Sequence, residues 1–438
     1  MAARIFYRLS VAGEKVPAEG PVLLVANHPN SLIDPALVVA VARRPVRFLA
    51  AAPVFDDPNV GWLIKAAGSI PVYRQHDDPS LMGRNEEMFA AVFEELAAGA
   101  AVGVFPEGVS HSEPSLVDLR TGAARIALGA RERYGLDPVI VPVGMVPTDK
   151  ARYRSKMLVV IGEPIEWGDM APEGAKDREA VRELTDRIRQ GLKRVTLNVE
   201  QWEDRPLVEA AETIWAARED VGGSEADEVA RLEVTTRILA AIRERPEPGD
   251  RELLRALRGH VRRLEVLSMV PRDLQLDVGW GASLRWILRR TVLIPSILVA
   301  LAGYLLFRPP DAATAALTKA MAPAEDRQST YKVLLGFITH AIWTIFLAVI
   351  VGFAMGPFVG LGTLVGIPLF GVAGLRLRES WKEAWRDVRR FFTIRARREL
   401  IDELAAEQAR IADGLEEIRR RWSEQSSEGH ASDSRERE

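Results

Sequence analysis

Residues 21–35 read Pro-Val-Leu-Leu-Val-Ala-Asn-His-Pro-Asn-Ser-Leu-Ile-Asp-Pro, an apolar run of strand length that ends in turn-forming residues. Around a continuous helix, His28 and Asp34 would lie roughly 120° apart, so the two side chains can meet only if the chain bends between them. The Pro-Asn step after His28 favours that bend. Asp34 and the proline after it are typical of an N-cap and the first position of a helix, which we expect over residues 36–43.

A histidine, His28, and a carboxylate, Asp34, therefore both follow the end of this strand. The Asp can fix the tautomer of the His and leave one ring nitrogen free to act as a base. A loop His beside an ordinary capping Asp fits the same residues, and three later segments decide between the two interpretations. The first is a short expected strand in residues 68–74 that ends at Arg74. The second is an expected strand in residues 104–108 with Glu107 at its end, and the third is a buried strand at residues 139–143.

In order and content, these four segments resemble the sequence blocks of the glycerolipid O-acyltransferases, the superfamily that acylates glycerol phosphate and lysophosphatidate. The resemblance covers about residues 1–165, which form the expected catalytic domain. It implies that His28 and Asp34 are the catalytic pair. It also implies that Arg74 and Glu107 hold the phosphate and glycerol parts of the acceptor.

The first and third blocks depart from the commonest pattern of that family. Five residues rather than four separate His28 from Asp34, and residues 105–112 read Phe-Pro-Glu-Gly-Val-Ser-His-Ser, without the arginine that usually follows the glycine. Both features resemble the branch of the fungal glycerol-3-phosphate and dihydroxyacetone-phosphate acyltransferases, which usually has glycine where this chain has Val109. Phosphate binding then depends more on two other arginines. The expected acceptor-binding residues are Arg74, Glu107, Gly108, Ser110, His111 and Arg120.

The role of Arg120 has two equal interpretations. It precedes a helix expected to begin near Thr121, and a helix N-terminus is a natural site for an anion. It is equally well an ordinary surface arginine.

The composition of the chain excludes several other classes of protein. At 438 residues and a net charge of −3, the chain is long enough for two or three domains and has no basic footprint for nucleic acid. It contains no cysteine, which excludes disulfides, thiolate metal sites and a cysteine nucleophile. The six histidines are scattered without metal-ligand spacing, so we expect neither a metal nor a cofactor.

Apolar strands alternate with amphipathic helices through the first 165 residues, which is the signature of βα units around a mostly parallel sheet. We therefore expect an α/β fold in which helices flank the sheet. The sites of such sheets lie at the carboxyl ends of strands, and His28, Arg74 and Glu107 all follow strand ends. Residues 166–282 are rich in charge and helical in pattern, so we expect a helical extension to which we assign no chemistry.

An apolar region from residue 283 to 375 predicts membrane attachment. Residues 333–354 and 357–375 are each long enough to span a bilayer, and residues 291–307 form a shorter run that contains a proline. Arginine-rich segments flank the region on both sides and resist translocation, which favours a C-terminal hairpin of two spans with the short run dipping into one leaflet. The protein is then multi-pass and its catalytic domain cytoplasmic, as the lack of an apolar N-terminal signal also indicates.

Other features of the hairpin and the tail leave two interpretations open. Glycines at four-residue spacing from Gly352 to Gly360 either let membrane helices approach closely or mark a kink, and a homodimer remains open. His340 is either a functional intramembrane residue or a neutral His bonded to a neighbouring helix. Residues 376–422 predict an amphipathic helical tail at a lipid surface, and residues 423–438 predict disorder.

Together with the resemblance, these patterns predict a membrane-bound O-acyltransferase. We expect it to move a fatty acyl group from acyl-CoA or acyl carrier protein to a hydroxyl of glycerol-3-phosphate or dihydroxyacetone phosphate, with lysophosphatidate as the alternative acceptor. His28 would take the hydroxyl proton and Asp34 would orient it. Ser31 and Ser110 lack the Gly-x-Ser-x-Gly elbow of a hydrolase nucleophile. A non-catalytic lipid-binding membrane scaffold is the alternative from another class.

Overall fold

The computed structural model of the protein divides into two compact units, of which the first holds residues 1–200 with two short later segments. Much of the extension expected at 166–282, and the start of the short apolar run at 291–307, lie outside the described residues. The structure describes residues 6–74, 77–113, 115–147, 150, 152–170, 175–196, 207–208, 210–211, 213–214, 249–267, 269–275, 296–321 and 325–435.

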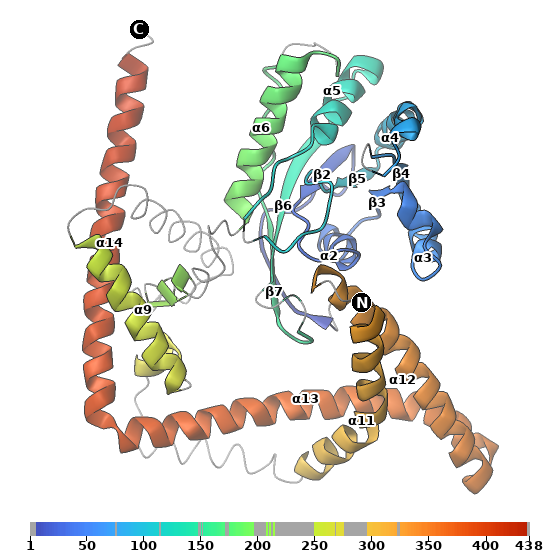
Figure 1. Cartoon of the computed structure of the whole chain (residues 1–438), viewed down its shortest axis with the longest axis vertical. Coiled ribbons are helices and arrows are strands. Elements are labelled where there is room, and N and C mark those ends of the chain that lie inside the picture. The colour runs from blue at the N-terminus through green and yellow to red at the C-terminus, as the bar shows by residue number, and fades with distance from the viewer. Residues whose placement is uncertain are drawn as a thin grey trace. The chain divides into compact units, whose positions relative to one another are not determined.

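The first unit is built on a seven-stranded sheet with the order β1-β7-β6-β2-β5-β3-β4 (Figure 1). All neighbouring strands are parallel except β6 and β7, which confirms the expected α/β fold with a mostly parallel sheet. The strands are β1 (Arg8–Gly13), β2 (Val22–Ala26), β3 (Val46–Ala51), β4 (Ile70–Val72), β5 (Ala101–Val104), β6 (Val139–Pro147) and β7 (Lys156–Ile161).

Helices connect these strands and flank the sheet. α2 (Ile33–Ala42) follows β2, and the short α3 (Gly61–Ala66) lies between β3 and β4. The others are η1 (Ala52–Asp56), η2 (Pro79–Arg84), α4 (Asn85–Ala97), α5 (Gly122–Tyr134) and α6 (Arg178–Val195). Sequence analysis did not predict β1. As an edge strand that pairs only with β7, it is half-exposed and lacks the continuous apolar run of the inner strands.

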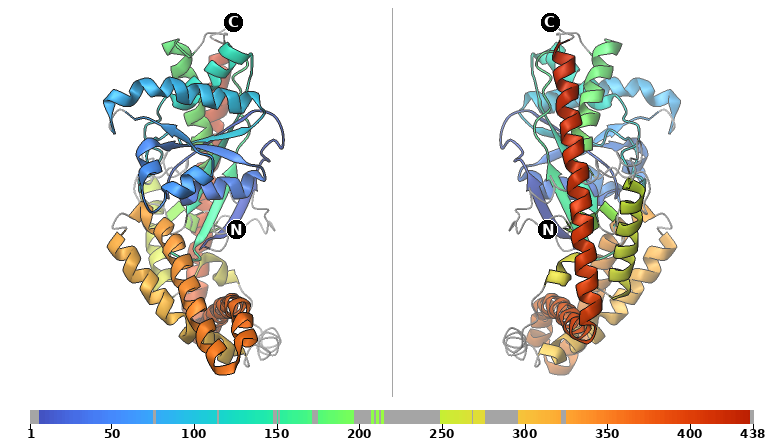
Figure 2. Two further views of the ribbon diagram at one scale, coloured as in Figure 1. Left: turned by 90° about the vertical axis from the view of Figure 1, so that its right-hand side faces the viewer. Right: turned by 90° about the vertical axis from the view of Figure 1, so that its left-hand side faces the viewer.

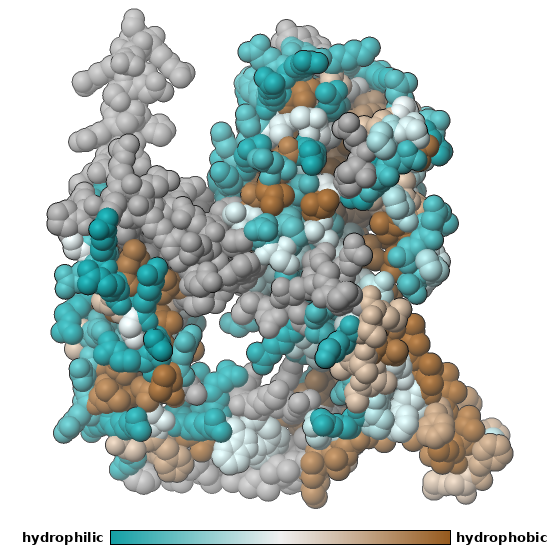
Figure 3. Space-filling view, in the orientation of Figure 1, coloured by the Kyte–Doolittle hydropathy of each residue, from teal (hydrophilic) through white to brown (hydrophobic). Residues whose placement is uncertain are grey.

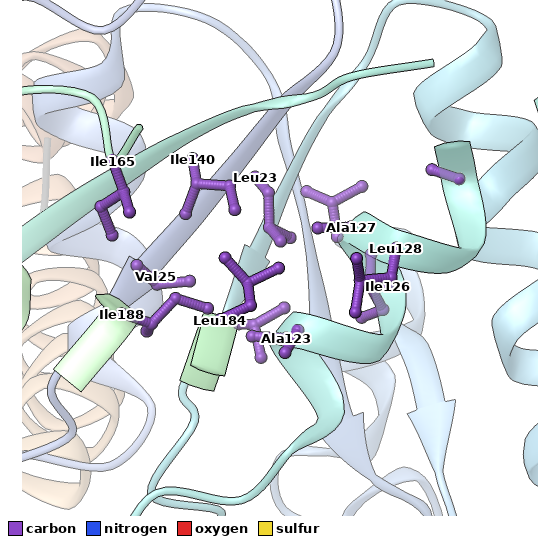
Figure 4. Close-up of a cluster of buried hydrophobic side chains, with 14 of the residues drawn as sticks. Leu23, Val25, Ala123, Ile126, Ala127, Leu128, Ile140, Ile165, Leu184 and Ile188 are labelled. Carbon is purple, nitrogen blue, oxygen red and sulfur yellow. The ribbon is translucent and has the colours of Figure 1, made fainter. Parts of the chain in front are cut away.

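The core of the unit lies between the central strand β2 and the helices α4, α5 and α6. All five residues of β2 are buried, because the strand lies between β5 and β6 and is covered by side chains on both faces. Leu23 and Val25 pack with Ile126 of α5 and Leu184 of α6 (Figure 4). Burial of each such side chain contributes about 1.5–3 kcal/mol.

α6 belongs to this core, which moves the expected boundary at residue 165. One apolar face of the helix is buried against the sheet and consists of Val181, Leu184, Ile188 and Leu192. Asp177 caps the helix by accepting the backbone N–H of Glu179 at 2.7 Å. The charge of this segment lies on the opposite, solvated face, so charge content alone misplaced the helix in the extension.

The second unit is helical among its described residues. It contains α9 (Asp250–Val266), η4 (Pro271–Gln275), α11 (Ser296–Met321), most of α12 (Glu325–Met355), α13 (Pro357–Ala396) and α14 (Arg398–Arg435). α9 lies alongside α14 (Figure 2), where the buried His260 contacts Glu407 at 2.9 Å. Residues 423–435, expected to be disordered, continue α14, since no proline interrupts the helix there.

Two of these helices are long and apolar enough to cross a membrane. The candidate spans are Thr330–Met355 in α12 and Pro357–Leu377 in α13, separated by Gly356 at φ +102°. Brown, apolar side chains gather over this part of the molecule (Figure 3). Both Phe353 and Phe358, beside the turn, are almost fully exposed. These helices coincide with the hairpin expected from the sequence.

Glycines bring these helices close together within one chain. A Cβ added to Gly360 would lie 2.7 Å from Cα of Gly352, and one added to Gly303 of α11 would lie 3.4 Å from Cα of Gly374. Such spacing is what small residues permit in membrane helices. From residue 296 the short apolar run is the start of α11, which continues through two prolines to Met321.

Candidate active site

His28 and Asp34 meet at the carboxyl end of β2. The Nδ1 of His28 lies 2.8 Å from Oδ2 of Asp34, and the same oxygen accepts the backbone N–H of Asn30 at 2.7 Å. The chain bends at Ser31, whose φ is +49°, and α2 begins at Ile33. Asp34 therefore lies inside the first turn of α2 and is not its N-cap, because its carboxylate is committed to the loop before the helix.

Burial is the main influence on the charge of Asp34. The side chain has no exposed surface, and this burial raises its pKa above the ordinary value of 3.8. The bonds from His28 and Asn30 act in the opposite direction, and nearby Glu107 raises the pKa further. The ionised form of Asp34 therefore depends on the two hydrogen bonds that converge on Oδ2.

These contacts fix the state of the His28 ring. When Nδ1 carries the proton and donates it to Asp34, Nε2 is an unprotonated acceptor. Nε2 makes no hydrogen bond within the described part of the chain, and the side chain is 18% exposed. The ring of Phe105 stacks on the imidazole at a centroid distance of 4.1 Å and an angle of 10°. His28 therefore presents one free, oriented base.

Glu107 lies beside this pair, after the neighbouring strand β5. Its Oε2 accepts the backbone N–H of His28 at 2.9 Å, and the backbone N–H of His111 donates to the carbonyl of His28 at 3.2 Å. Oε1 of Glu107 and Oδ1 of Asp34 are buried without a hydrogen-bond partner among the described residues. A buried oxygen without a partner is costly, so each is a place where a ligand hydroxyl gains a bond.

His111 forms a second imidazole–carboxylate contact, with Glu107. Its Nε2 lies 2.9 Å from Oε2 of Glu107, with the distance but not the angle of a hydrogen bond. Its Nδ1 accepts the backbone N–H of Glu113 at 3.1 Å, so Nδ1 carries no proton and the neutral ring is protonated at Nε2. Ser110, on the same segment, is half-buried.

Two arginines converge on Gly108. Arg74 donates through Nη1 to the carbonyl of Gly108 at 3.0 Å and holds both carboxylate oxygens of Asp77, at 2.6 and 3.0 Å. The stem of Arg120 lies over Gly108, where a Cβ would be 3.3 Å from its Cγ, and φ of Gly108 is +76°. Only glycine fits this position without strain.

The two arginines differ in whether a nearby carboxylate offsets their positive charge. Asp77 offsets that of Arg74, whereas the exposed Arg120 has no side-chain partner among the residues that the structure describes. The sequence did not predict four residues near the site, because nothing in the local pattern around them distinguishes them. They are Asp77, Tyr7, Asn27 and Lys150. Within the described ranges, no group of three or more His, Cys, Asp or Glu side chains is arranged to hold a metal ion.

Comparisons with known proteins agree with this arrangement. Residues 8–146 match the family described as Acyltransferase. Glycerol-3-phosphate O-acyltransferase 1 of Saccharomyces cerevisiae is 26% identical in an alignment 292 residues long that covers 46% of this chain and 38% of the yeast protein. Glycerol-3-phosphate O-acyltransferase 2 of the same yeast is 34% identical in an alignment 139 residues long that covers 30% of this chain and 18% of that protein.

A bacterial relative matches over most of its own length. The 1-acyl-sn-glycerol-3-phosphate acyltransferase of Bacillus subtilis is 25% identical over 190 residues, which are 43% of this chain and 87% of that protein. The present chain spans 38% and 18% of the length of the two yeast relatives. The family match, over residues 8–146, lies within the unit that carries the site.

Proposed function

We propose that this protein, whose residues 8–146 form an acyltransferase domain of the glycerolipid acyltransferase superfamily, moves a fatty acyl group from a thioester donor to a hydroxyl of a glycerol-phosphate acceptor. The observation that carries the proposal is the free Nε2 of His28. It is oriented by Asp34 and lies beside the buried Glu107 at the edge of a parallel sheet, where such sheets bind their ligands.

His28 acts as the general base in this reaction. Its Nε2 takes the proton of the acceptor hydroxyl while that oxygen attacks the carbonyl carbon of the thioester. The C–S bond then breaks, and the protonated His28 returns the proton to the leaving thiolate, so that an ester and a thiol result. A positioned base contributes a factor of about 10²–10⁴. Alignment of the two substrates contributes on the order of 7–11 kcal/mol.

The acceptor phosphate binds at the two arginines and the glycerol part binds at Glu107. Arg120 attracts the phosphate with its uncompensated charge. Arg74, held in place by Asp77, orients the phosphate through its hydrogen bonds. Gly108 lets both approach because it has no side chain. The unpartnered Oε1 of Glu107 accepts a hydroxyl of the glycerol.

The favoured acceptors are glycerol-3-phosphate and dihydroxyacetone phosphate. The spacing of five residues between His28 and Asp34 and the Ser110-His111 pair support this choice, as do the names of the two yeast glycerol-3-phosphate O-acyltransferases. The Bacillus relative makes lysophosphatidate the alternative acceptor. The acyl donor is acyl-CoA or acyl carrier protein.

An assay of purified membranes tests this proposal. Labelled acyl-CoA and acyl carrier protein are each supplied with glycerol-3-phosphate, dihydroxyacetone phosphate or lysophosphatidate, and labelled lipid is measured. We expect transfer to one of the first two acceptors. Transfer to lysophosphatidate alone would support the alternative acceptor. Binding of lipid vesicles without transfer to any acceptor would contradict the enzyme and favour a scaffold.

The two apolar helices anchor the protein as a hairpin with the catalytic unit on the cytoplasmic side. Arginine-rich sequence before α11 and in α13 after residue 375 resists translocation, which favours an even number of crossings. Because the chain has no cysteine, single cysteines at Ser115, Ser329 and Ser432 report topology through an impermeant thiol reagent on intact cells. Labelling at Ser432 from outside would contradict the hairpin.

A further inference from the structure

Lys150 is a buried lysine in contact with the segment that carries His111. The residue is only 6% exposed, although lysine is almost never fully buried unless its charge is satisfied. Its Nζ donates to Oγ of Ser112 at 2.5 Å and to the carbonyl of His111 at 3.3 Å. The ammonium is thus fixed on two oxygens that lie four and five residues after Glu107.

The backbone of Lys150 contacts the opposite loop. Its carbonyl accepts the hydroxyl of Tyr7 at 2.5 Å and the amide of Asn30 at 3.4 Å, and the amide of Asn30 also donates to the hydroxyl of Tyr7. Tyr7 and Asn30 are fully buried. The backbone N–H of Asn30 donates to Asp34. One residue therefore joins the loop of His28 and Asp34 to the loop of Glu107 and His111.

We propose that Lys150 is a positioning residue of this site, whose buried ammonium holds the His111 segment and, through it, the carboxylate of Glu107 that receives the acceptor. The inference rests on the proposed function. It follows from the cost of burial, since an ammonium removed from water must keep its hydrogen bonds and the oxygens that accept them cannot move away. Two further bonds, between His28 and residues 107 and 111, join the Glu107 loop directly to the loop of His28.

The same contact has a different chemical interpretation, which the experiment separates. A serine beside a lysine forms a nucleophile–base pair in some hydrolases. Nζ donates both to Oγ of Ser112 and to the carbonyl of His111, which only accepts hydrogen bonds. An ammonium has donors for both oxygens and no lone pair with which to take a proton from Ser112. We assign Lys150 this positioning role, and the Ser112→Ala arm below separates it from proton abstraction.

The test compares Lys150→Met with the control Lys156→Met in the full-length protein in membranes. Methionine keeps the length of the apolar stem and removes the charge, and Lys156 is an exposed lysine on β7. We expect Lys150→Met to raise the acceptor KM about tenfold or more while the donor KM stays within twofold of wild type. Lys150→Arg keeps the positive charge, so its acceptor KM should lie between those of wild type and Lys150→Met. The control should match wild type.

A merely structural role would give a different result. Loss of folded protein lowers the apparent kcat but leaves both KM values unchanged, since KM does not depend on the amount of active enzyme. Unchanged KM values in Lys150→Met, or an equal rise in both, would overturn the proposal. If wild type itself transfers no acyl group, the proposed function fails instead, and the two failures are thereby distinguished.

Ser112→Ala supplies the second arm. Under the proposal it removes an acceptor of the ammonium and keeps the carbonyl of His111, so it should raise the acceptor KM by less than Lys150→Met does and leave kcat within tenfold of wild type. Incubation with labelled acyl donor alone should leave no label on the denatured protein. A collapse of kcat, together with label that disappears in Ser112→Ala, would make Ser112 a nucleophile and overturn the positioning role.

Discussion

The site contains two imidazole–carboxylate pairs on neighbouring strands, and they differ in which ring nitrogen meets the carboxylate. In the first pair Nδ1 of His28 contacts Asp34, which leaves Nε2 free. In the second pair Nε2 of His111 faces Glu107, while Nδ1 accepts the backbone N–H of Glu113. The lone pair of Nδ1 is thus occupied, and Nε2 carries the proton of the neutral ring, so His111 offers no free base. A base is recognised by the nitrogen that remains free, and not by the presence of a histidine beside a carboxylate.

The two carboxylates differ in the same way. Asp34 is wholly buried and contacts the ring that we propose as the base, where a carboxylate charge would stabilise an imidazolium. Glu107 contacts a backbone N–H and the second ring, and its Oε1 has no hydrogen-bond partner among the described residues. The first pair should therefore control kcat and the second should control the acceptor KM.

Asp34→Asn should give the largest effect that distinguishes the pairs. Asparagine keeps the shape and accepts the same hydrogen bonds, but it removes the charge beside the imidazolium. We expect kcat to fall about 10²–10⁴-fold, the range of general base catalysis, with little change in either KM. Steady-state kinetics with varied acceptor and donor checks this. A change confined to the acceptor KM would place Asp34 in acceptor binding.

Glu107→Gln should act mainly on the acceptor. A hydrogen bond to a charged group is worth about 1.5–3 kcal/mol, so the acceptor KM should rise on the order of tenfold to 150-fold. The donor KM should stay nearly unchanged. The measurement is the KM of each substrate at saturation of the other. Near-normal kinetics would reduce Glu107 to a turn residue that joins the two loops.

Arg120→Ala tests the phosphate site beside the second pair. Its charge is uncompensated, so its removal should raise the acceptor KM about tenfold, the equivalent of roughly 1.4 kcal/mol. The matched control is the double variant Arg74→Ala with Asp77→Ala, which removes a neutral ion pair and should cost less. Arg74→Ala alone leaves Asp77 near the phosphate and should raise the acceptor KM more than the double variant. A larger loss in the double variant than in Arg120→Ala would make Arg74 the main phosphate ligand.

The smallest expected effect concerns stability and pH. Burial raises the pKa of Asp34, so the folded state binds this proton more tightly than the unfolded state. Between the ordinary value of 3.8 and the raised folded value, wild type should lose stability relative to Asp34→Asn as the pH rises, and the difference should then level off. Thermal midpoints of both proteins in detergent, measured across this window, check the sign. A gain of wild-type stability relative to Asp34→Asn as the pH rises would mean that the hydrogen bonds outweigh burial.

Local sequence predicted the chemistry of the first pair better than that of the second. The buried strand, the turn and the carboxylate all lie within residues 21–35, so spacing alone brings His28 to Asp34. The contacts of His111 depend on the backbone of Glu113 and on Lys150, which follows β6, 39 residues later in the chain. No local pattern reports such contacts, so the sequence predicted a place for His111 among the acceptor-binding residues but not its partners.

Contacts that the local pattern does not report also explain why the expected domain boundary and the expected N-cap of α2 differ from the structure. α6 was assigned to an extension because its charged residues dominate the composition, whereas its apolar face is decided by the sheet it covers. Asp34 was expected to cap α2, but its hydrogen bonds with His28 and with the backbone of Asn30 commit its carboxylate to the loop before the helix. Contacts within a short stretch of sequence were predicted well, and contacts between elements far apart in the sequence were not.

The most direct test of the account compares His28→Gln with His111→Gln in one membrane preparation, with the acyl-transfer rate per folded protein as the measurement. Glutamine can keep a hydrogen bond to the carboxylate in each pair but supplies no base. We predict that His28→Gln loses about 10²–10⁴-fold in kcat, while His111→Gln keeps kcat within tenfold and raises mainly the acceptor KM. Equal losses of kcat in the two variants, or a greater loss in His111→Gln, would contradict the assignment of His28 as the base.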